Sequence, residues 1–172
     1  QVDAYVHVFV ASVDLGAGSF DNCSIDTFLV NGSDSVFFNC SNLGINTVNV
    51  FMSDPSGNPA NCVSTITVED NIPPTANCVS GPINLQLDPN GQAALTAAQV
   101  DNGSVDNCSI VNRTLSRSTF NCADVGSLVS VTLTVFDQDN NSNSCSVNVI
   151  TNDTVRPSMV CRAATINLGP SG

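Results

Sequence analysis

The chain has 172 residues, of which 15 are acidic and 4 are arginine, with no lysine, so its net charge is −11 at neutral pH. Such a negative surface repels nucleic acid and anionic membranes, because both are bound through a basic patch on the protein. No run reaches the ~18 apolar residues of a transmembrane helix. We therefore expect no nucleic-acid partner and no membrane insertion.

The eight cysteines indicate an oxidising, extracellular setting and a disulfide framework. A zinc site is the competing interpretation, but it would need Cys-x-x-Cys pairs, and the sequence contains none. No signal peptide is visible, so we expect the sequence to be a mature or excised segment.

Alternation of apolar and polar residues predicts short strands along the whole chain, because side chains of a strand point to opposite faces in turn. Asn, Ser, Thr, Val and Asp dominate the composition, which also favours strands and turns. The Ala-rich segment 92–100 is the one place where we expect a helical turn. In chain order, the clearest predicted strands are 4–10, 47–52, 62–68, 129–135 and 145–151. Many short strands at this spacing predict an all-β sandwich.

A repeat of 83 residues (145 − 62) organises these strands. The segment 62–74 opens with a cysteine, continues as a strand and an acidic, proline-containing turn, and recurs as 145–157. Each copy predicts the last strand of one domain, a linker and the start of the next domain. We therefore predict a first domain over 1–71 that lacks its own first strand, a complete second domain over 72–154, and a linker with the first strand of a further repeat over 155–172.

Strand direction favours one disulfide pairing. The first and last strands of such a sandwich run the same way, so Cys78 and Cys145, which open them, lie at the same end. This favours Cys78–Cys145 and leaves Cys108–Cys122 as a local pair, with Cys23–Cys40 as its equivalent in the first domain. Four cysteines allow three pairings, so the other two stay open.

Four segments resemble the hyalin-repeat (HYR-like) modules of the immunoglobulin type: Asp106–Ile110, Phe120–Gly126, Val131–Asp137 and Val68–Cys78. Such modules are strung in tandem in giant secreted surface proteins of Bacteroidetes, including gliding-motility adhesins. The resemblance implies two tandem immunoglobulin-like β-sandwiches in a structural or adhesive segment of a cell-surface filament. It specifies function poorly, because such modules serve as spacers as often as binders.

Acidic residues in the linkers and in one turn are candidate calcium ligands. Carboxylates at a joint between domains can share an ion, and the turn at 137–143 places oxygen-bearing side chains at every second residue, as calcium loops do. The alternative is a set of solvated acidic turns. The candidate ligands are Glu69, Asp70, Asn71, Asn152, Asp153, Asp137 and Asp139. Calcium is the one cofactor that the sequence suggests.

Catalysis is not expected. The single histidine, His7, lies in a predicted strand, and no Gly-x-Ser-x-Gly turn accompanies it. Glycan binding is the alternative function, although the absence of Trp and the presence of one Tyr weaken it. Ser35 and Thr154 fit the Asp-Ser/Thr-aliphatic pattern of O-glycosylation in Bacteroidetes secreted proteins.

The two ends look like halves of one domain. The tail 161–172 matches the start of the second domain at 78–91, and Gln1 follows Gly172 as Gln92 follows Gly91. We therefore expect residues 161–172 of one copy to complete the first domain of the next, with Cys161 bonded to Cys62 of that copy. Either a continuous polypeptide of period 172 or separate subunits joined by strand exchange would produce this arrangement.

Overall fold

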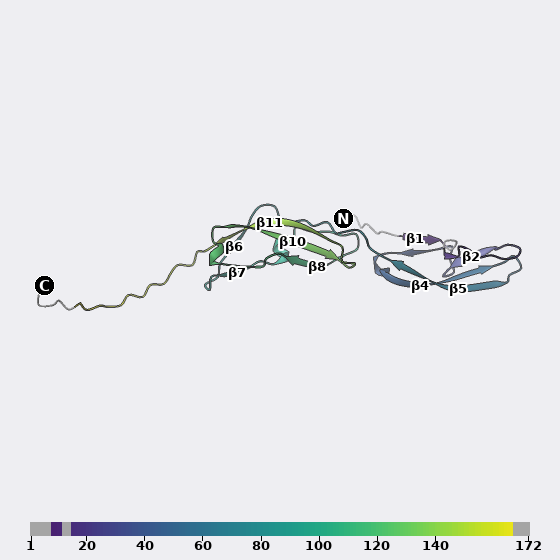
Figure 1. The fold of residues 1–172 in the computed structure, drawn as a ribbon, viewed down its shortest axis with the longest axis horizontal. Helices are drawn as coiled ribbons and strands as arrows, with labels where there is room; N and C mark the ends of the chain where they lie inside the picture. The colour runs from purple at the N-terminus through teal and green to yellow at the C-terminus, as the bar shows by residue number, and fades with distance from the viewer. Residues whose placement is uncertain (1–7, 12–14, 167–172) are drawn as a thin grey trace.

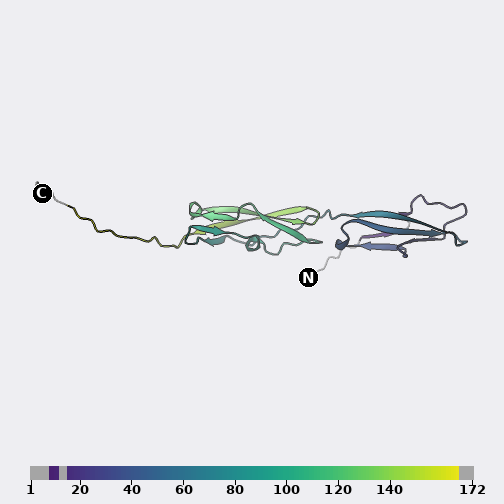
Figure 2. The same cartoon turned by 90° about the horizontal axis from the view of Figure 1, so that it is seen from below.

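The computed structural model describes residues 8–11 and 15–166, and within them the protein is predominantly β-strand, as predicted. Figures 1 and 2 show two elongated bodies, one after the other along the long axis, with the C-terminal segment extending beyond the second. We call residues 8–11 and 15–71 the first half and residues 72–152 the second half. His7 lies outside the described residues. None of the described helices is long and apolar enough to cross a membrane.

The first half contains two sheets. One is the pair β1-β3, and the other has the order β2-β4-β5, with neighbouring strands antiparallel throughout. The strands are β1 (Val8–Ala11), β2 (Thr27–Val30), β3 (Ser35–Phe38), β4 (Gly44–Ser53) and β5 (Pro59–Val68), with the short 3-10 helix η1 (Cys40–Asn42) after β3.

The second half repeats this arrangement and adds one strand. Its larger sheet has the order β6-β11-β10-β8, and β7 pairs with β9. The elements are β6 (Ile83–Gln86), β7 (Gln92–Ala94), α2 (Ala97–Val100), β8 (Ile110–Leu115), β9 (Thr119–Asn121), η2 (Cys122–Asp124), β10 (Leu128–Asp137) and β11 (Ser142–Asn152). The helix α2 lies in the Ala-rich segment where the sequence predicts a helical turn. The added strand, β6, runs parallel to β11.

Strand alternation builds the core of the second half. Val131, Leu133 and Val135 of β10 are fully buried, while the residues between them are partly exposed. Removing such aliphatic side chains from water stabilises a fold by about 1.5–3 kcal/mol each. They pack with further buried residues from β6, α2, β9 and β11, together with one from the segment before α2: Leu85, Val100, Phe120, Val147, Val149 and Leu95.

Two disulfides are present, and only one of them is a predicted pair. Cys78 is bonded to Cys145, with the parallel β6 and β11 confirming the strand directions from which this pair was predicted. The second bond joins Cys40 to Cys108, so it links the first half to the second. The predicted pairs Cys23–Cys40 and Cys108–Cys122 are therefore wrong, and Cys23, Cys62, Cys122 and Cys161 are free and exposed.

The length of β10 explains why Cys108 and Cys122 do not pair. Cys122 lies six residues before Leu128, where β10 begins, whereas the loop of Cys108 packs beside Asp137 at the end of β10. Ten strand residues span about 33 Å. A disulfide needs Cα atoms within about 7 Å. The Cα atoms of Cys40 and Cys108 are 5.4 Å apart.

Candidate functional site

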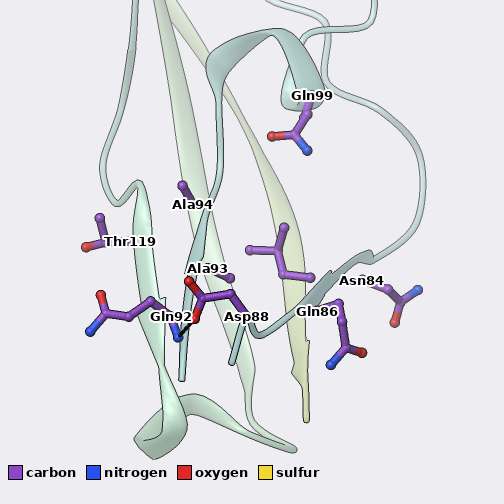
Figure 3. Close-up of a pocket in the computed structure, with 9 residues that line it drawn as sticks. Asn84, Gln86, Asp88, Gln92, Ala93, Ala94, Gln99 and Thr119 are labelled. Carbon is purple, nitrogen blue, oxygen red and sulfur yellow. Dashed lines mark hydrogen bonds between the residues drawn. The ribbon is translucent and has the colours of Figure 1, made fainter. Parts of the chain in front are cut away.

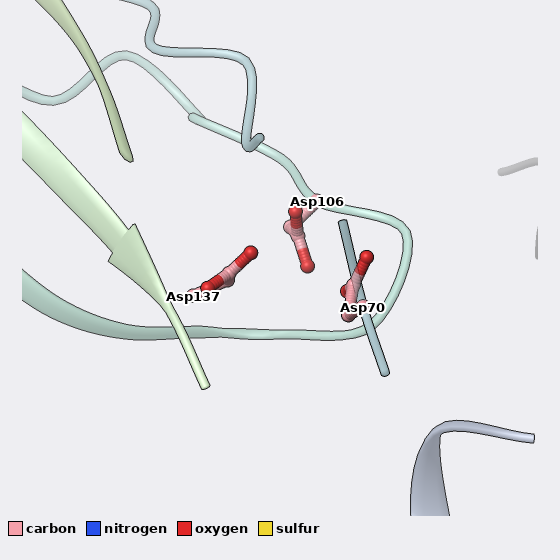
Figure 4. Close-up of side chains that lie close together, drawn as sticks. All are labelled: Asp70, Asp106 and Asp137. Carbon is pink, nitrogen blue, oxygen red and sulfur yellow. The ribbon is translucent and has the colours of Figure 1, made fainter. Parts of the chain in front are cut away.

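The joint between the halves contains a cluster of three carboxylates. Asp70 comes from the segment that leaves β5, Asp106 from the loop before β8, and Asp137 from the end of β10. Figure 4 shows the three side chains converging on one space. One oxygen atom of each lies within 4.8 Å of the others. Because Ca²⁺ binds oxygen at 2.3–2.6 Å, two ligands of one ion are at most about 5 Å apart, and the cluster meets this limit.

Local turns fix two of these carboxylates. Asn141 donates to both oxygens of Asp137, from its backbone N at 2.7 Å and from Nδ2 at 2.7 Å. The same Nδ2 donates to the backbone oxygen of Asp70 at 2.6 Å. Asp70 accepts from the backbone N of Ile72 on one oxygen and from Nδ2 of Asn107 on the other. These hydrogen bonds tie the linker to both loops of the second half.

Burial makes this cluster chemically unusual. Asp137 is 0% exposed and Asp70 is 6% exposed, and neither forms an ion pair among the described residues. Oδ1 of Asp106 and Oδ1 of Asn107 are buried and have no hydrogen-bond partner in the described part of the chain. Buried carboxylates are costly unless a cation or donors compensate them. A divalent cation would neutralise the buried negative charge, and the unpaired Oδ1 atoms of Asp106 and Asn107 could act as its ligands.

The structure divides the predicted calcium ligands into two groups. It brings Asp70 and Asp137 together, and Asp139 beside them accepts a hydrogen bond from the backbone N of Asp70 at 2.6 Å. Glu69 and Asn71 are exposed on either side of Asp70. Asn152 and Asp153 lie at the other end of the second half, where β11 ends. The candidate centre thus occupies the first of the two predicted linkers.

Sequence reasoning missed Asp106. The signal that could have found it is the repeated Asp-Asn-Cys motif at 21–23 and 106–108, which we used only to align cysteines. In both copies the aspartate accepts a hydrogen bond from the backbone N of the cysteine, at 2.8 Å in the first half and 2.9 Å in the second. The motif therefore presents a carboxylate and a cysteine together at one end of each half.

An apolar cavity of about 260 Å³ lies beside the cluster. Residues of both halves line it, including Phe38 and Cys40 from the first and Cys108 from the second, together with the linker residue Ile72. The Cys40–Cys108 bond thus crosses the joint next to the carboxylates. A covalent bond, side-chain hydrogen bonds and a candidate ion site therefore act at the same joint.

A second candidate site is the outer edge of β5. Among the described residues, β5 pairs only with β4, whereas its counterpart β11 lies between β10 and β6. The inward positions of β11 are buried at Val147, Val149 and Thr151, but the matching positions of β5 are only partly buried. An exposed strand edge of this kind offers backbone groups for pairing with another strand.

A polar groove of about 560 Å³ lies between β6 and β7 in the second half. In Figure 3, Asn84 and Gln86 lie on one side of it, Gln92 and Thr119 on the other, and Gln99 above. Asp88 is hydrogen-bonded to the backbone N of Gln92 at 2.9 Å, which closes the turn beneath the groove. The groove offers amide donors and acceptors but no aromatic platform.

Two ion pairs brace the second half outside the joint. Arg113 binds Asp101, and Arg117 binds Asp124 while it also stacks 4.6 Å from the ring centre of Phe120. Burial raises the pKa of Asp101, but hydrogen bonds from Ser104 and the charge of Arg113 outweigh it, so the net pKa is lowered. The pKa of Asp124 is lowered chiefly by the backbone N–H of Asn121, with Arg117 contributing.

The predicted modification sites differ in accessibility. Ser35 opens β3 and is half-buried, with Ala11 of β1 as its strand partner. Thr154 is exposed in the segment that follows β11. Enzymatic glycosylation needs an accessible hydroxyl, so Thr154 is the better of the two predicted acceptors.

No family model matches the chain, and the search of curated proteins finds no match. Function is therefore inferred from the geometry of the joint and of the β5 edge.

Proposed function

We propose that this chain is a structural segment of an extracellular, cell-surface filament or adhesin, built from two tandem immunoglobulin-like sandwiches whose copies join end to end. Residues 161–172 of one copy would supply the strand that the first domain of the next copy lacks. The resemblance to hyalin-type repeats supports the setting, and the two disulfides are typical of proteins that fold outside the cytoplasm.

The observation that carries the proposal is the difference between β5 and β11. In the second half, β6 pairs in parallel with β11, with Ile83 opposite Val149 and Leu85 opposite Thr151. The repeat places Ile166 at the position of Ile83 and Ile66 at the position of Val149. Ile166 is 84% exposed in a single copy. A tail strand in the register of β6 would set Ile166 opposite Ile66 of the next copy and cover its open edge.

The same register explains two of the free cysteines. Cys161 stands at the position of Cys78, and Cys62 stands at the position of Cys145. Because Cys78 and Cys145 are bonded inside one copy, the tail strand would bring Cys161 within bonding distance of Cys62 in the next copy. Residues 167–172, which include the rest of the predicted strand, lie outside the described residues.

An aspartate in the tail tests strand donation. Ile166→Asp would place a charge on the core face of the neighbouring domain and is expected to abolish end-to-end association in sedimentation measurements. Val160→Asp is the matched control, because Val160 is 87% exposed and its counterpart Asn77 is exposed in the second half. Association that survives Ile166→Asp, or is lost equally with Val160→Asp, would contradict strand donation.

Denaturing electrophoresis with reductant separates the two forms of the assembly. Separate subunits joined by strand exchange would collapse to one band of about one copy, whereas a continuous polypeptide would persist as a giant band. Digestion at aspartate and arginine adds a direct readout. A continuous chain would yield a peptide that runs from Ala163 through Gly172 into Gln1.

We also infer that calcium stiffens the joint through Asp70, Asp106 and Asp137. The supporting observation is the buried carboxylate cluster with the orphaned Oδ1 of Asp106. An ion there would bond the linker to two loops of the second domain and so restrict bending. Three protein carboxylates and further oxygen ligands are a donor set that Ca²⁺ accepts readily.

Calorimetric titration with calcium tests this inference. One site per copy is expected, and Asp106→Asn should weaken binding at least tenfold because one charged ligand becomes a neutral amide. Asp88→Asn, in an exposed turn outside the joint, is the control. Chelation should also increase bending between the halves in solution scattering. Absence of binding, or equal loss with both variants, would remove calcium from the proposal.

Surface-glycan binding is a second candidate function. The groove lined by Asn84, Gln86, Gln92 and Gln99 favours it, because amide side chains are suited to sugar hydroxyls. The absence of an aromatic platform predicts weak binding. A glycan array probed with the wild-type chain and with Gln92→Ala tests this candidate. Loss of binding in the variant is expected, and equal binding of the two chains would mean that the glycan does not bind in this groove.

A further inference from the structure

The disulfide between Cys40 and Cys108 crosses from one half to the other, and the repeat contains a second, unbonded copy of the same two cysteines. Cys40 lies in the motif Phe-Asn-Cys, which recurs at Phe120–Cys122. Cys108 lies in the motif Asp-Asn-Cys, which recurs at Asp21–Cys23. Cys122 and Cys23 therefore correspond to a bonded pair, yet both are free and exposed in the single copy.

The local structure around Cys122 matches that around the bonded Cys40. η1 and η2 share one capping arrangement, in which Asn39 and Asn121 accept from the backbone N two residues later, both at 2.9 Å. Cys40 and Cys122 each follow such an asparagine directly, as the first residue of the helix. The end of the second half therefore presents Cys122 on the same scaffold that presents Cys40 to Cys108.

The local structure around Cys23 likewise matches that around the bonded Cys108. Asp21 and Asp106 hold the following cysteine loop through equivalent hydrogen bonds to the backbone N of Cys23 and of Cys108. Beside the loop, Asn58 donates to both oxygens of Asp54 at 2.8 and 2.7 Å, as Asn141 donates to both oxygens of Asp137. The outer end of the first half thus repeats the end of the second half that receives η1.

The exit linker completes the correspondence. Oδ1 of Asp153 accepts from the backbone N of Val155 at 2.9 Å, as Oδ1 of Asp70 accepts from the backbone N of Ile72 at 3.0 Å. Four hydrogen-bonded turns at the internal joint are therefore each matched by a turn at one of the two free ends. The partner that fits these ends is a second copy of this chain.

We propose that Cys122 of one copy forms a disulfide with Cys23 of the next, so that the internal joint is repeated between copies. This proposal rests on the end-to-end assembly proposed above and adds a second covalent bond to it. With Cys161–Cys62, each junction between copies would hold two disulfides, and all four cysteines that are free in the single copy would be paired.

The bond forms by thiol–disulfide exchange with an oxidised dithiol protein of the extracytoplasmic compartment. The thiolate of Cys122 attacks a sulfur of the donor disulfide, which gives a mixed disulfide and releases one donor thiolate. The thiolate of Cys23 from the next copy then attacks the Cys122 sulfur and displaces the second donor sulfur. Two cysteine thiols are oxidised, one donor disulfide is reduced to the dithiol, and the two protons pass to solvent or to the donor thiolates.

Peptide mapping of the assembled full-length chain tests the bond directly. Cleavage before aspartate and after arginine, with the Arg156–Pro157 bond left uncut because proline follows the arginine, places each of the eight cysteines on its own peptide. After free thiols are alkylated, we expect peptide 118–123 joined to peptide 21–25. Assembly from a mixture of ¹⁵N-labelled and unlabelled copies should give pairs with one labelled partner, because the two cysteines belong to different copies.

Two outcomes of the map separate the two proposals. If peptide 54–69 is joined to peptide 153–162 while 118–123 and 21–25 are alkylated, copies assemble through the tail and the Cys122–Cys23 bond is refuted. If no peptides are joined between copies and the chain stays monomeric, the end-to-end assembly itself fails.

Variants provide an independent readout. Cys62→Ser with Cys161→Ser removes the tail bond, so a reductant-sensitive ladder that persists in non-reducing gels must come from Cys122–Cys23. Adding Cys23→Ser should abolish the ladder beyond dimers, and moving the thiol by one residue, with Cys23→Ser and Ser24→Cys, should not restore it. Both positions are exposed, so these changes leave the fold intact. A ladder that survives Cys23→Ser would overturn the proposal.

Discussion

The two halves have related sequences but differ in how completely they are closed. Nine buried hydrophobic residues form the core of the second half, whereas the cluster of the first half contains Val30, Phe38 and Val48 among the described residues. The second half has a strand on each side of β11, and a disulfide ties the start of its chain to that strand. The first half has neither feature at β5 within its described part.

This difference shows what a single strand contributes. β6 adds only four residues to the sheet, yet it covers the edge of β11, places Leu85 in the core beside Thr151, and follows the segment in which Cys78 is bonded to Cys145. In the proposed assembly the counterpart of β6 for the first half is the tail, whose described residues 153–166 extend away from the second half (Figure 1). Residues 15–71 therefore form a unit whose larger sheet ends in an uncovered strand, β5, in a single copy.

Matched core substitutions should give the largest effect. Phe120→Ala removes a side chain that is 1% exposed, and we expect it to lower the free energy of unfolding of the second half by about 3–5 kcal/mol. Phe38→Ala, at the same motif position in the first half, should cost about 1–2 kcal/mol less in a single copy, because its surroundings are only partly packed. Hydrogen exchange measured by mass spectrometry resolves the two halves.

Assembly should reduce that difference. When the tail of a neighbour covers β5, the cost of Phe38→Ala should approach the cost of Phe120→Ala. Equal costs in single copies would mean that the first half is already closed, and an unchanged difference after assembly would mean that the tail does not complete it.

The two disulfides should have different effects when they are removed. Cys78→Ser with Cys145→Ser opens a loop of 67 residues and should destabilise the second half by about 4 kcal/mol in the chain-entropy model. Cys40→Ser with Cys108→Ser should leave the exchange protection of each core nearly unchanged but increase bending between the halves in solution scattering. A loss of core protection in the second variant would show that the joint stabilises the cores directly.

The smallest expected effect is a loss of stability of the second half at acidic pH, caused by protonation of Asp101. Its pKa is lowered in the folded state, so its contribution is present above the unfolded pKa of about 3.9 and is lost as pH falls through the lower folded value. Asp101→Asn should cost about 1 kcal/mol at pH 7, since Arg113 is partly exposed, and less at an acidic pH at which the folded-state carboxyl is protonated. Asp34→Asn, in an exposed turn, is the control for denaturant unfolding at both pH values.

Particular residues show how far the sequence predicts this molecule. Alternation locates β10 and β11, because Val131, Leu133 and Val135 are buried at every second position. Strand direction locates Cys78–Cys145. The repeat could not decide between Cys23–Cys40 and Cys40–Cys108, because equivalent cysteines give the same pattern whether bonds form within a unit or across a joint. Asp106 was missed because it approaches Asp70 and Asp137 only through the folded loop.

The two disulfides together determine how the chain would respond to tension. A force that pulls on the ends passes from Cys40 to Cys145 by two covalent routes. One crosses the Cys40–Cys108 bond and then 37 residues (145 − 108), and the other follows 38 residues (78 − 40) and then crosses the Cys78–Cys145 bond. Either bond alone therefore limits this part of the chain to about 130 Å, against about 350 Å for the same stretch with neither bond. Full extension would require reduction of both bonds, so the length that the segment can release under load depends on the redox state of its surroundings.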